Sequence, residues 1–558
     1  MAAPVTDAEL QADLDAYRQC GGNRSAAARL RQLPRNTYRD RLALAEKRFG
    51  VQLGKVVDGR VDYVKARRLP LPKGDGVARY FLTAAQNNTH PHPGLANVRA
   101  YVDWLNRRRG DSCRLMVGTF TYALDAYGEK AVKRGTWRPD GKLWYDPQLE
   151  PFICDESVEL APGLVWCGEM NILPTAANPL VSLDDYNGRK SNIVPHAKIA
   201  MESIPSFPDE PTKFNYSTGA ITQRNYIQKR AGILAERKHS YGGVLVEVDS
   251  AGNWFVRQIE LGADGELYDI GPRGYRAVRV AGGKVETIRA NAAPSASWLE
   301  AITWGDIHAS EMDVWIRALG WHRGGMLDVL APRRQFFHDL FSMRSRSHHE
   351  WKNFHRHFEK WVNDEGGVEA EVQVTADFVN EADRPWCESY VVRSNHDRHL
   401  DRWLNEGRVD WDPENAVYFA LLQHQKLAAI ESGNEDFNVL EWALRRAGVP
   451  DGLRFLGEDE SFVICKGANS PGIECGMHGD LGPSGARGST RNLRRMGRPA
   501  NKAHDHRATW MDGVISVGAC SLNMPYMRGP SAASASHAIT WRNGARSVLT
   551  MWAGKYRA

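Results

Sequence analysis

Five short polar segments in the second half of the chain place the strongest constraint on its fold. Each follows an apolar run that predicts a β-strand, and in chain order they are Gly305-Asp306-Ile307-His308, His338-Asp339, Asn395-His396-Asp397, His478 and His504-Asp505-His506. Strands whose carboxyl ends lie along one edge of a sheet bring the loops that follow them together. The sequence therefore predicts an α/β fold in which these polar side chains gather at one edge.

The side chains in these segments are suited to binding divalent cations. They offer two aspartates, one asparagine and four histidines as ligands, which is enough for two ions. The Asp-x-His and His-x-His spacings place alternate residues of an extended segment on the same side. A carboxylate shared by two ions holds them about 3.5–4 Å apart, a separation that suits in-line attack at phosphorus. Unrelated core or surface histidines would explain the pattern only through five independent coincidences in this order.

The order of the segments resembles the calcineurin-like metallophosphoesterase superfamily, whose pattern is D-x-H, G-D, G-N-H-[DE], H and G-H-x-H. The resemblance runs from Trp304 to Ala519 and implies a two-sheet sandwich flanked by helices. It implies two divalent ions, with Mn²⁺ favoured over Fe, Zn, Ni or Mg. The implied ligands are Asp306, His308 and His506 for the first ion, Asp339 as a bridge, and Asn395, His478 and His504 for the second. His396 would protonate the leaving oxygen, and Asp397 would orient or charge His396.

The chain departs from this pattern where the superfamily has glycine, because His338, Ser394 and Ala503 occupy those positions. The bulk of His338 makes Asp339 the least secure ligand, with Asp328 as the competing candidate. We favour Asp339, because residues 335–339 have the pattern of a strand followed by a turn, whereas residues 327–330 have that of a helix.

The first 70 residues differ in charge from the rest. They contain 14 lysines and arginines against 8 aspartates and glutamates, while the remaining chain is close to neutral. Residues 6–49 show helical spacing and begin with a capping box at Thr6-Asp7-Ala8-Glu9. The segment that begins at Gly22 resembles helix-turn-helix segments of bacterial regulators. This resemblance implies DNA contacts from Arg35, Asn36, Thr37, Tyr38 and Arg39. A helical hairpin used for oligomerisation is the alternative.

These patterns divide the chain into four parts. Residues 1–50 are expected to form the helix-turn-helix, 51–75 a basic linker, 76–296 an α/β domain of unknown role, and 297–558 the calcineurin-like domain. In the α/β domain, strands alternate with helices. Its most polar cluster, residues 87–92, is interpreted as a structured loop.

Two further clusters lie close to the expected ligands in sequence. Arg487, Arg491 and Arg494 fall between the fourth and fifth polar segments. We expect them to contact a substrate backbone, in preference to forming a solvated basic helix. The segment from Gly482 onward has the pattern of a helix start that could also meet a phosphate. The histidine-rich residues 347–357 could line a cleft, but a polar helix face is favoured.

Other features of the sequence indicate a cytoplasmic protein. The chain has no secretory signal pattern and no apolar run long enough to span a membrane. Its eight cysteines are scattered and form no CxxC pair, so buried thiols are expected and disulfides are not.

Three phrases extend the resemblance over most of the chain: FLTAAQNNTHPH, YGGVLVEVD and the run from TWGDIHA to HDL. They resemble the pre-early proteins of tailed phages that degrade host DNA. This implies a metal-dependent nuclease that hydrolyses phosphodiester bonds of duplex DNA, in the host cytoplasm and without a membrane partner. Two alternatives stay open: a small-molecule phosphodiesterase or nucleotidase, and a DNA-binding regulator with a degenerate metal site. Whether the chain forms a homo-oligomer is left open.

Overall fold

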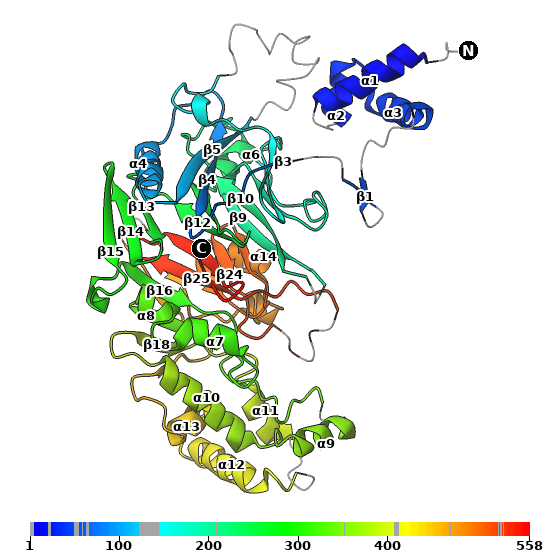
Figure 1. Ribbon diagram of the computed structural model, residues 1–558. Helices are drawn as coiled ribbons and strands as arrows, with labels where there is room; N and C mark the ends of the chain where they lie inside the picture. Colours follow the sequence, from blue (N-terminus) through cyan, green and yellow to red (C-terminus); the bar gives the residue numbers. More distant parts are fainter. Residues whose placement is uncertain are drawn as a thin grey trace.

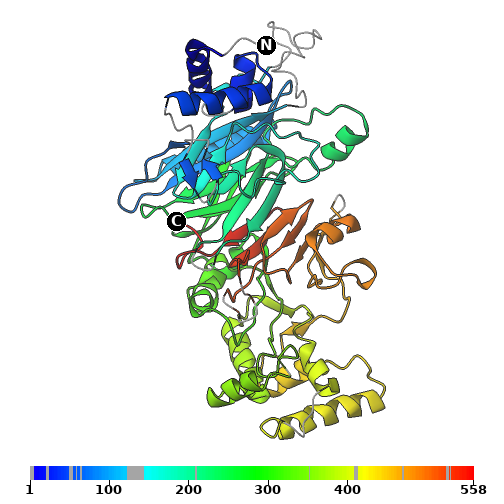
Figure 2. The ribbon, with the colours of Figure 1, turned by 90° about the vertical axis from the view of Figure 1, so that its right-hand side faces the viewer.

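The computed structural model describes residues 5–20, 24–49, 55–57, 60–62, 66–121, 144–207, 210–350, 352–406, 412–467, 470–522, 524, 527 and 529–558. A three-helix N-terminal unit, a β-rich body and a group of helices follow one another along the long axis (Figures 1 and 2).

No helix within the described ranges combines the length and the apolar character needed to cross a bilayer. All eight cysteines are free thiols; five are buried as predicted, whereas Cys20, Cys154 and Cys465 are partly exposed.

The N-terminal unit consists of α1 (Asp7–Gln19), α2 (Arg24–Leu30) and α3 (Arg35–Phe49). The predicted capping box is confirmed, because the Glu9 amide donates to the Thr6 hydroxyl while the Glu9 carboxylate accepts from the Thr6 amide. The helices surround a small core that includes Leu10, Leu14 and Tyr38. Three packed helices agree with the predicted helical content, and the helix-turn-helix assignment stays a prediction.

An eleven-stranded mixed sheet runs through the body in the order β20-β21-β22-β24-β23-β9-β10-β8-β7-β6-β3. Its strands from the first half of the chain are β3 (Arg67–Arg68), β6 (Ser157–Ala161), β7 (Leu164–Cys167), β8 (Ser191–Val194), β9 (His196–Ile204) and β10 (Lys213–Gly219). Those from the second half are β20 (Val463–Ile464), β21 (Ile473–Glu474), β22 (Ala500–Lys502), β23 (Thr509–Met511) and β24 (Val514–Ser516). The expected linker therefore contributes an edge strand, β3, to this sheet.

Two smaller sheets complete the first half of the body. One has the order β12-β11-β4-β5 and contains β4 (Ala78–Gln86), β5 (Ser112–Phe120), β11 (Gly242–Val248) and β12 (Trp254–Glu260). The other contains β13 (Leu267–Ile270), β14 (Tyr275–Ala281) and β15 (Lys284–Arg289). The helices here are α4 (Gly94–Asn106) and α6 (Arg230–Glu236). A two-stranded ribbon of β1 (Lys55–Val57) and β2 (Arg60–Asp62) precedes them.

The last sheet has six strands in the order β19-β18-β17-β16-β25-β26. They are β16 (Leu299–Thr303), β17 (Arg334–Phe337), β18 (Glu388–Val391), β19 (Arg454–Phe455), β25 (Ser536–Trp541) and β26 (Arg546–Thr550). Strands β16 to β19 are parallel, and β25 and β26 are antiparallel additions. Because β17 follows β16 through α7 (Val314–Trp321) and α8 (Met326–Leu330), the chain alternates strands and helices here.

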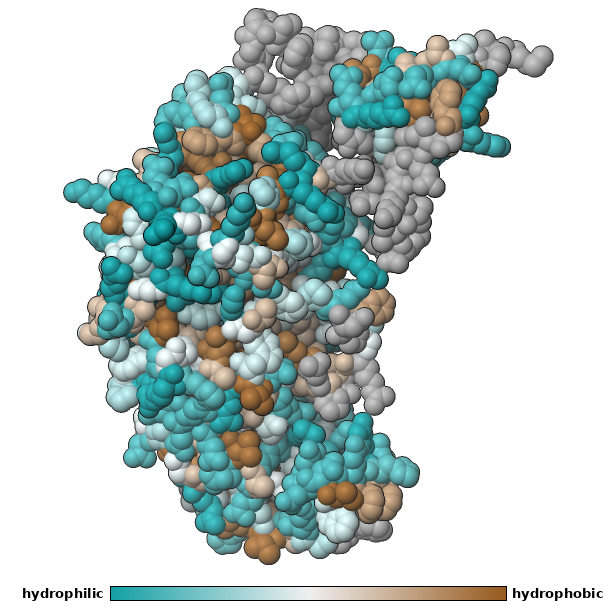
Figure 3. All heavy atoms as spheres, in the orientation of Figure 1, coloured by the Kyte–Doolittle hydropathy of each residue, from teal (hydrophilic) through white to brown (hydrophobic). Residues whose placement is uncertain are grey.

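Longer insertions after β17 and β18 form the group of helices at the other end of the molecule. They comprise α9 (Phe354–Val362), α10 (Val368–Ala382), α11 (His399–Glu406), α12 (Ala416–Glu431) and α13 (Val439–Arg446). Helix α9 exposes Phe354, Phe358 and Trp361, and Figure 3 shows hydrophobic residues on the surface there. The short helix α14 (Thr490–Leu493) and the 3₁₀ turns Glu150–Phe152, Pro294–Ala296, Pro483–Gly485 and Arg494–Met496 lie elsewhere.

The six-stranded sheet packs on the β20–β22 part of the large sheet. Phe336 and Tyr390 from the first meet Ile464 and Ile473 from the second in one buried cluster. A second cluster joins Met201 and Val246 to Trp510, because β9 pairs with β23 across the halves of the sequence. The expected boundary at 296/297 thus separates two stretches of sequence that share one sheet and one core.

Candidate metal centre

The predicted ligands lie at the carboxyl ends of strands from both sheets. In the six-stranded sheet, Asp306 and His308 follow β16, Asp339 follows β17, and Asn395 follows β18. In the large sheet, His478 follows β21, while His504 and His506 follow β22. Strands β16, β17 and β18 are parallel to one another, and β21 is parallel to β22. In each sheet the loops that follow these strands therefore lie at the same edge. The five polar segments therefore converge as predicted.

The backbone at this edge is unusually strained. Four of the predicted ligands have a left-handed backbone although none is glycine: the φ angles are 47° at His308, 44° at Asp339, 76° at His504 and 53° at His506. Such conformations cost on the order of 1–3 kcal/mol each and persist where surrounding contacts impose them. The surrounding fold imposes these conformations, and they orient the four side chains toward one cluster.

Asp339 lies at the centre of the cluster. With His308 and His396 it forms one group whose ligand atoms all lie within 4.8 Å of one another, and with Asp306 and His506 it forms another. Its carboxylate lies 3.6 Å from Nε2 of His308, and that of Asp306 lies 3.4 Å from Nε2 of His506. Asp339 belongs to both groups, which otherwise contain the three ligands predicted for the first ion and His396, a residue that is not a predicted ligand.

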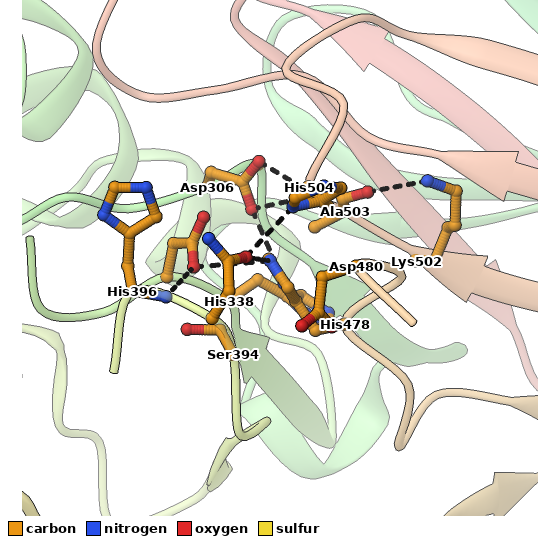
Figure 4. A network of polar contacts seen from close by, with 12 residues as sticks. Asp306, His338, Ser394, His396, His478, Asp480, Lys502, Ala503 and His504 are labelled. Atoms are coloured by element: carbon orange, nitrogen blue, oxygen red, sulfur yellow. Dashed lines mark hydrogen bonds and ion pairs between the residues drawn. The ribbon is translucent and has the colours of Figure 1, made fainter. Parts of the chain in front are cut away.

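The three residues predicted for the second ion also meet. Oδ1 of Asn395 lies 3.0 Å from Nε2 of His478 and 3.0 Å from Nδ1 of His504. Nε2 of His478 lies 3.3 Å from Asp339, which ties this group to the first. Figure 4 shows Asp306, His478 and His504 turned toward the same point, with the backbone amide of His504 donating to the Asp306 carboxylate.

His396 stands at the side of this cluster, and its Nδ1 lies 3.2 Å from the carbonyl oxygen of Ser342. The predicted partnership with Asp397 is wrong. Asp397 accepts a hydrogen bond from the amide of Phe341 at 3.0 Å, and burial raises its pKa to about 6. Asp397 therefore supports the segment after Asp339, and its other carboxylate oxygen forms no hydrogen bond to His396 within the described residues.

The alternative bridging candidate, Asp328, lies elsewhere. It is on α8, where it pairs with Arg384 and accepts from the amide of Gly324. His338, whose bulk had made Asp339 doubtful, is buried with its Nδ1 3.4 Å from Nδ1 of His478. The imidazole therefore turns away from the carboxylates and supports His478.

The electrostatics of the cluster favour bound cations. Burial and the neighbouring Asp339 carboxylate raise the pKa of Asp306 well above its usual range. Burial lowers the pKa of His504 and of His506 to about 4, so both imidazoles are neutral and able to donate a lone pair at neutral pH. Burial opposes the charged form of His478 too, but Asp339 outweighs it and raises that pKa to about 9. Because burial and the Asp339 charge disfavour the charged form of Asp306, a positive charge beside the two carboxyl groups would be stabilising.

An open cavity of about 540 Å³ borders the cluster. Its walls include Asp339, His396 and His504, together with Arg487. Arg491 is exposed on α14, and Arg494 forms an ion pair with Asp512 at 2.9 Å. Of the three predicted basic residues, Arg487 alone lines this cavity. The expected helix start is present but leads to a short helix, because α14 begins at Thr490 with Ser489 as its N-cap and has only four residues, after a 3₁₀ turn at Pro483–Gly485.

Two residues at the centre were missed by the sequence reasoning. Arg507 lines the cavity, and its position directly after the His-x-His motif was the available signal. The hydroxyl of Ser342 lies 3.2 Å from Nδ1 of His308, and no pattern in the sequence marked it. The histidine-rich segment contributes as well, since the His348 ring contacts His399, which in turn contacts His396.

The predicted DNA contacts on α3 are only partly at the surface. Asn36, Thr37 and Arg39 are exposed, whereas the side chain of Arg35 lies outside the described part of the structure. Tyr38 is fully buried, and its hydroxyl donates to the backbone carbonyl of Asp13 at 2.6 Å. Its inclusion among the base-contacting residues is therefore wrong, because the ring forms part of the helical core.

Comparison with known proteins adds one relative. No protein-family model matches the chain, and no solved structure matches it. The sequence is 32% identical over 495 residues to "Protein A1" of Escherichia phage T5, an alignment that covers 86% of this chain and 83% of that protein. An identity of this size over nearly the full length of both chains shows common descent. The chain belongs to the family of phage proteins that includes Protein A1 of phage T5.

Proposed function

We propose that this phage-family protein is a metal-dependent DNA nuclease that hydrolyses phosphodiester bonds and degrades host DNA during infection. The observation that carries the proposal is the position of Asp339, whose carboxylate lies 3.6 Å from Nε2 of His308, in the first set of predicted ligands, and 3.3 Å from Nε2 of His478, in the second. A shared carboxylate between two cation sites is the arrangement used for in-line displacement at phosphorus. The relationship to a phage protein and the arginines beside the cavity favour a nucleic acid as the substrate.

The residues present fit two divalent cations. The carboxylates of Asp306 and Asp339 are both fully buried, and Oδ2 of Asp339 has no hydrogen-bond partner in the described part of the protein. Buried carboxylates of this kind need a compensating positive charge. The mixture of carboxylate, amide and imidazole donors suits Mn²⁺ and related transition metals. Asp306, His308 and His506 would hold one ion, Asn395, His478 and His504 the other, and Asp339 both.

The protein's own groups divide the remaining tasks. Bound cations would supply neutralisation of phosphate charge and activation of water. The strained loops hold the ligand side chains in fixed directions, so little reorganisation is needed when the phosphate enters. The Nδ1–H of His396 can donate to the Ser342 carbonyl, which fixes the ring at the cavity wall. From that place His396 would give a proton to the departing sugar oxygen.

Metal-dependent cleavage of linear and circular duplex DNA tests the proposal. The wild-type protein in Mn²⁺ is expected to degrade DNA, while EDTA or the substitution His396→Ala removes the activity. His424→Ala, an exposed histidine on α12, serves as the control and should behave as wild type. Cutting of the circle would show endonuclease action. A wild-type protein that left DNA intact but hydrolysed bis(p-nitrophenyl) phosphate would refute the nuclease in favour of a small-molecule phosphodiesterase.

A deletion of residues 1–50 tests the role of the N-terminal helices. Loss of phosphate contacts should weaken DNA binding and reduce its salt dependence, without changing hydrolysis of bis(p-nitrophenyl) phosphate. Unchanged DNA affinity at low and high salt would instead assign these helices to assembly.

A further inference from the structure

The middle third of the chain, whose role the sequence does not indicate, reaches the cavity of the metal centre. Glu202 on β9 forms an ion pair with Arg507 at 2.7 Å, and Arg507 follows His506 directly. In the β9–β23 ladder, Glu202 stands opposite Thr509. Arg507 precedes Thr509 by two residues and so shares its face, diagonal to Glu202. One residue of the middle region thus sets the direction of a guanidinium at the site.

The same region also holds the neighbouring part of the cavity wall, since Ala533 pairs with Arg507. Ser206 and Ser531 exchange two backbone hydrogen bonds of 2.8 and 2.9 Å, and the Thr212 hydroxyl donates to the carbonyl of Ala533 at 2.7 Å. Ser531 and Ala533 both line the cavity. The cavity is therefore composite, with its ligands from the C-terminal half and its walls fixed by the middle region.

Arg507 retains hydrogen-bonding capacity after these contacts. Its hydrogen bonds to Glu202 and to the carbonyl of Ser203 both use Nη2. Its Nη1 forms no hydrogen bond within the described residues, and the side chain is 39% exposed, whereas Nε is buried. An exposed guanidinium nitrogen of this kind can donate a charge-assisted hydrogen bond to a phosphate oxygen. Among the residues that the structure describes, none forms an ion pair with Arg487, the other arginine of the cavity.

We propose that Arg507, together with Arg487 in the wall of the same cavity, binds a second phosphate of a nucleic-acid strand next to the phosphate at the metal centre, and that Glu202 positions Arg507. This inference rests on the proposed nuclease function and deepens it, because it assigns the site to a strand with consecutive phosphates. A substrate with a single phosphate has no group for this subsite. The middle region then serves substrate binding through Glu202.

Thymidine trinucleotides with two linkages test the subsite directly. In one substrate both linkages are phosphates. In each of two matched substrates, one of the two linkages is replaced by a neutral methylphosphonate. For wild type, neutralising the flanking linkage should raise KM on the order of tenfold, which corresponds to the loss of one charge-assisted hydrogen bond. In Arg507→Gln the charged and neutral trinucleotides should have nearly the same KM.

The position of Glu202 is tested by a double-substitution cycle. Glu202→Gln alone should reduce the difference in KM between the substrates with a charged and a neutral flanking linkage. Adding Glu202→Gln to Arg507→Gln should change this difference little further. Arg507→Lys, which keeps the charge but loses the planar edge, should be intermediate. Arg333→Gln is the matched control, since Arg333 pairs with Glu388 at the amino end of β17, the end of the sheet away from the ligands.

The outcomes separate the two proposals. Two results would overturn the subsite without affecting the nuclease proposal. One is that wild type cleaves the trinucleotides with the same KM whether the flanking linkage is charged or neutral. The other is that the effects of Glu202→Gln and Arg507→Gln on KM are additive. A wild-type protein with bound Mn²⁺ that cleaves no trinucleotide and no duplex DNA would refute the nuclease, and the subsite with it.

Discussion

Asp339 lies between the two sets of predicted ligands, 3.6 Å from Nε2 of His308 and 3.3 Å from Nε2 of His478. Its replacement should therefore have the largest effect of any single change at the candidate metal centre. Asp339→Asn removes the shared negative charge but keeps the shape of the side chain. We expect binding of the two cations to weaken on the order of 100-fold or more, since even residues that merely support a ligand contribute 10–100-fold. Titration calorimetry with Mn²⁺ measures this loss directly.

The control for this change is Asp377→Asn, an exposed aspartate on α10. It should bind Mn²⁺ as wild type does. If Asp339→Asn also retained wild-type affinity and two bound ions, Asp339 would not be a ligand. The same measurement on Asp328→Asn should show no loss, because Asp328 pairs with Arg384 away from the cluster.

Buried histidines outside the metal centre predict sensitivity to acid. Burial lowers the pKa of His196 to about 4, from an ordinary value near 6.5. Between pH 6.5 and pH 4 the unfolded chain binds a proton at His196 that the folded chain excludes. The contribution of His196 to the free energy of unfolding is therefore fully present above pH 6.5 and decreases as the pH falls. The loss should approach about 1.4 kcal/mol per pH unit for this residue.

Urea unfolding at pH 7 and pH 5 checks this prediction with His196→Gln, which cannot take up the proton. The variant is expected to lose less free energy of unfolding between the two pH values than wild type does. Equal losses in both proteins would show that His196 does not contribute to acid sensitivity.

Several helices and strands could be predicted because local residues determine them. Thr6 and Glu9 form the predicted cap of α1, and the strand-then-turn pattern before Asp339 corresponds to β17. The helix expected to open from the segment after Gly482 is confirmed only as the short α14, which a 3₁₀ turn precedes. Gly482, Pro483 and Gly485 lie at the start of this segment. Glycine and proline disfavour a helix there more strongly than the basic residues favour one.

The cap of α1 gives a test at the level of one helix. Thr6→Ala removes the hydroxyl that accepts from the Glu9 amide, which should destabilise α1 by about 1 kcal/mol. Amide hydrogen exchange in the first turns of α1 should accelerate about fivefold, because 1 kcal/mol changes the opening equilibrium by that factor. Protection of α10 in the same protein is the internal reference. Unchanged exchange in α1 would show that the cap contributes nothing.

The molecule as a whole depends on pairing between distant parts of the sequence. Because β9 pairs with β23, and because Met201 and Trp510 share a buried cluster, residues 297–558 lack part of their own core when separated. We expect a 297–558 fragment to show no cooperative thermal transition. A 66–558 fragment, which keeps the shared sheet, should unfold cooperatively at nearly the temperature of the same region in the full chain. Scanning calorimetry distinguishes them, and a cooperative transition in the shorter fragment would contradict the shared core.

The sequence by itself determined the residue types of the candidate metal centre, the strands that precede them and the choice of Asp339 over Asp328, because each motif depends on neighbours a few positions away. The tertiary structure alone decided that Asp397 would bind the Phe341 amide and that Tyr38 would be buried. It alone also brought Glu202 to Arg507, which lie 305 positions apart. These outcomes depend on how whole sheets and helices pack, and a local pattern carries no information about which distant surface will cover it.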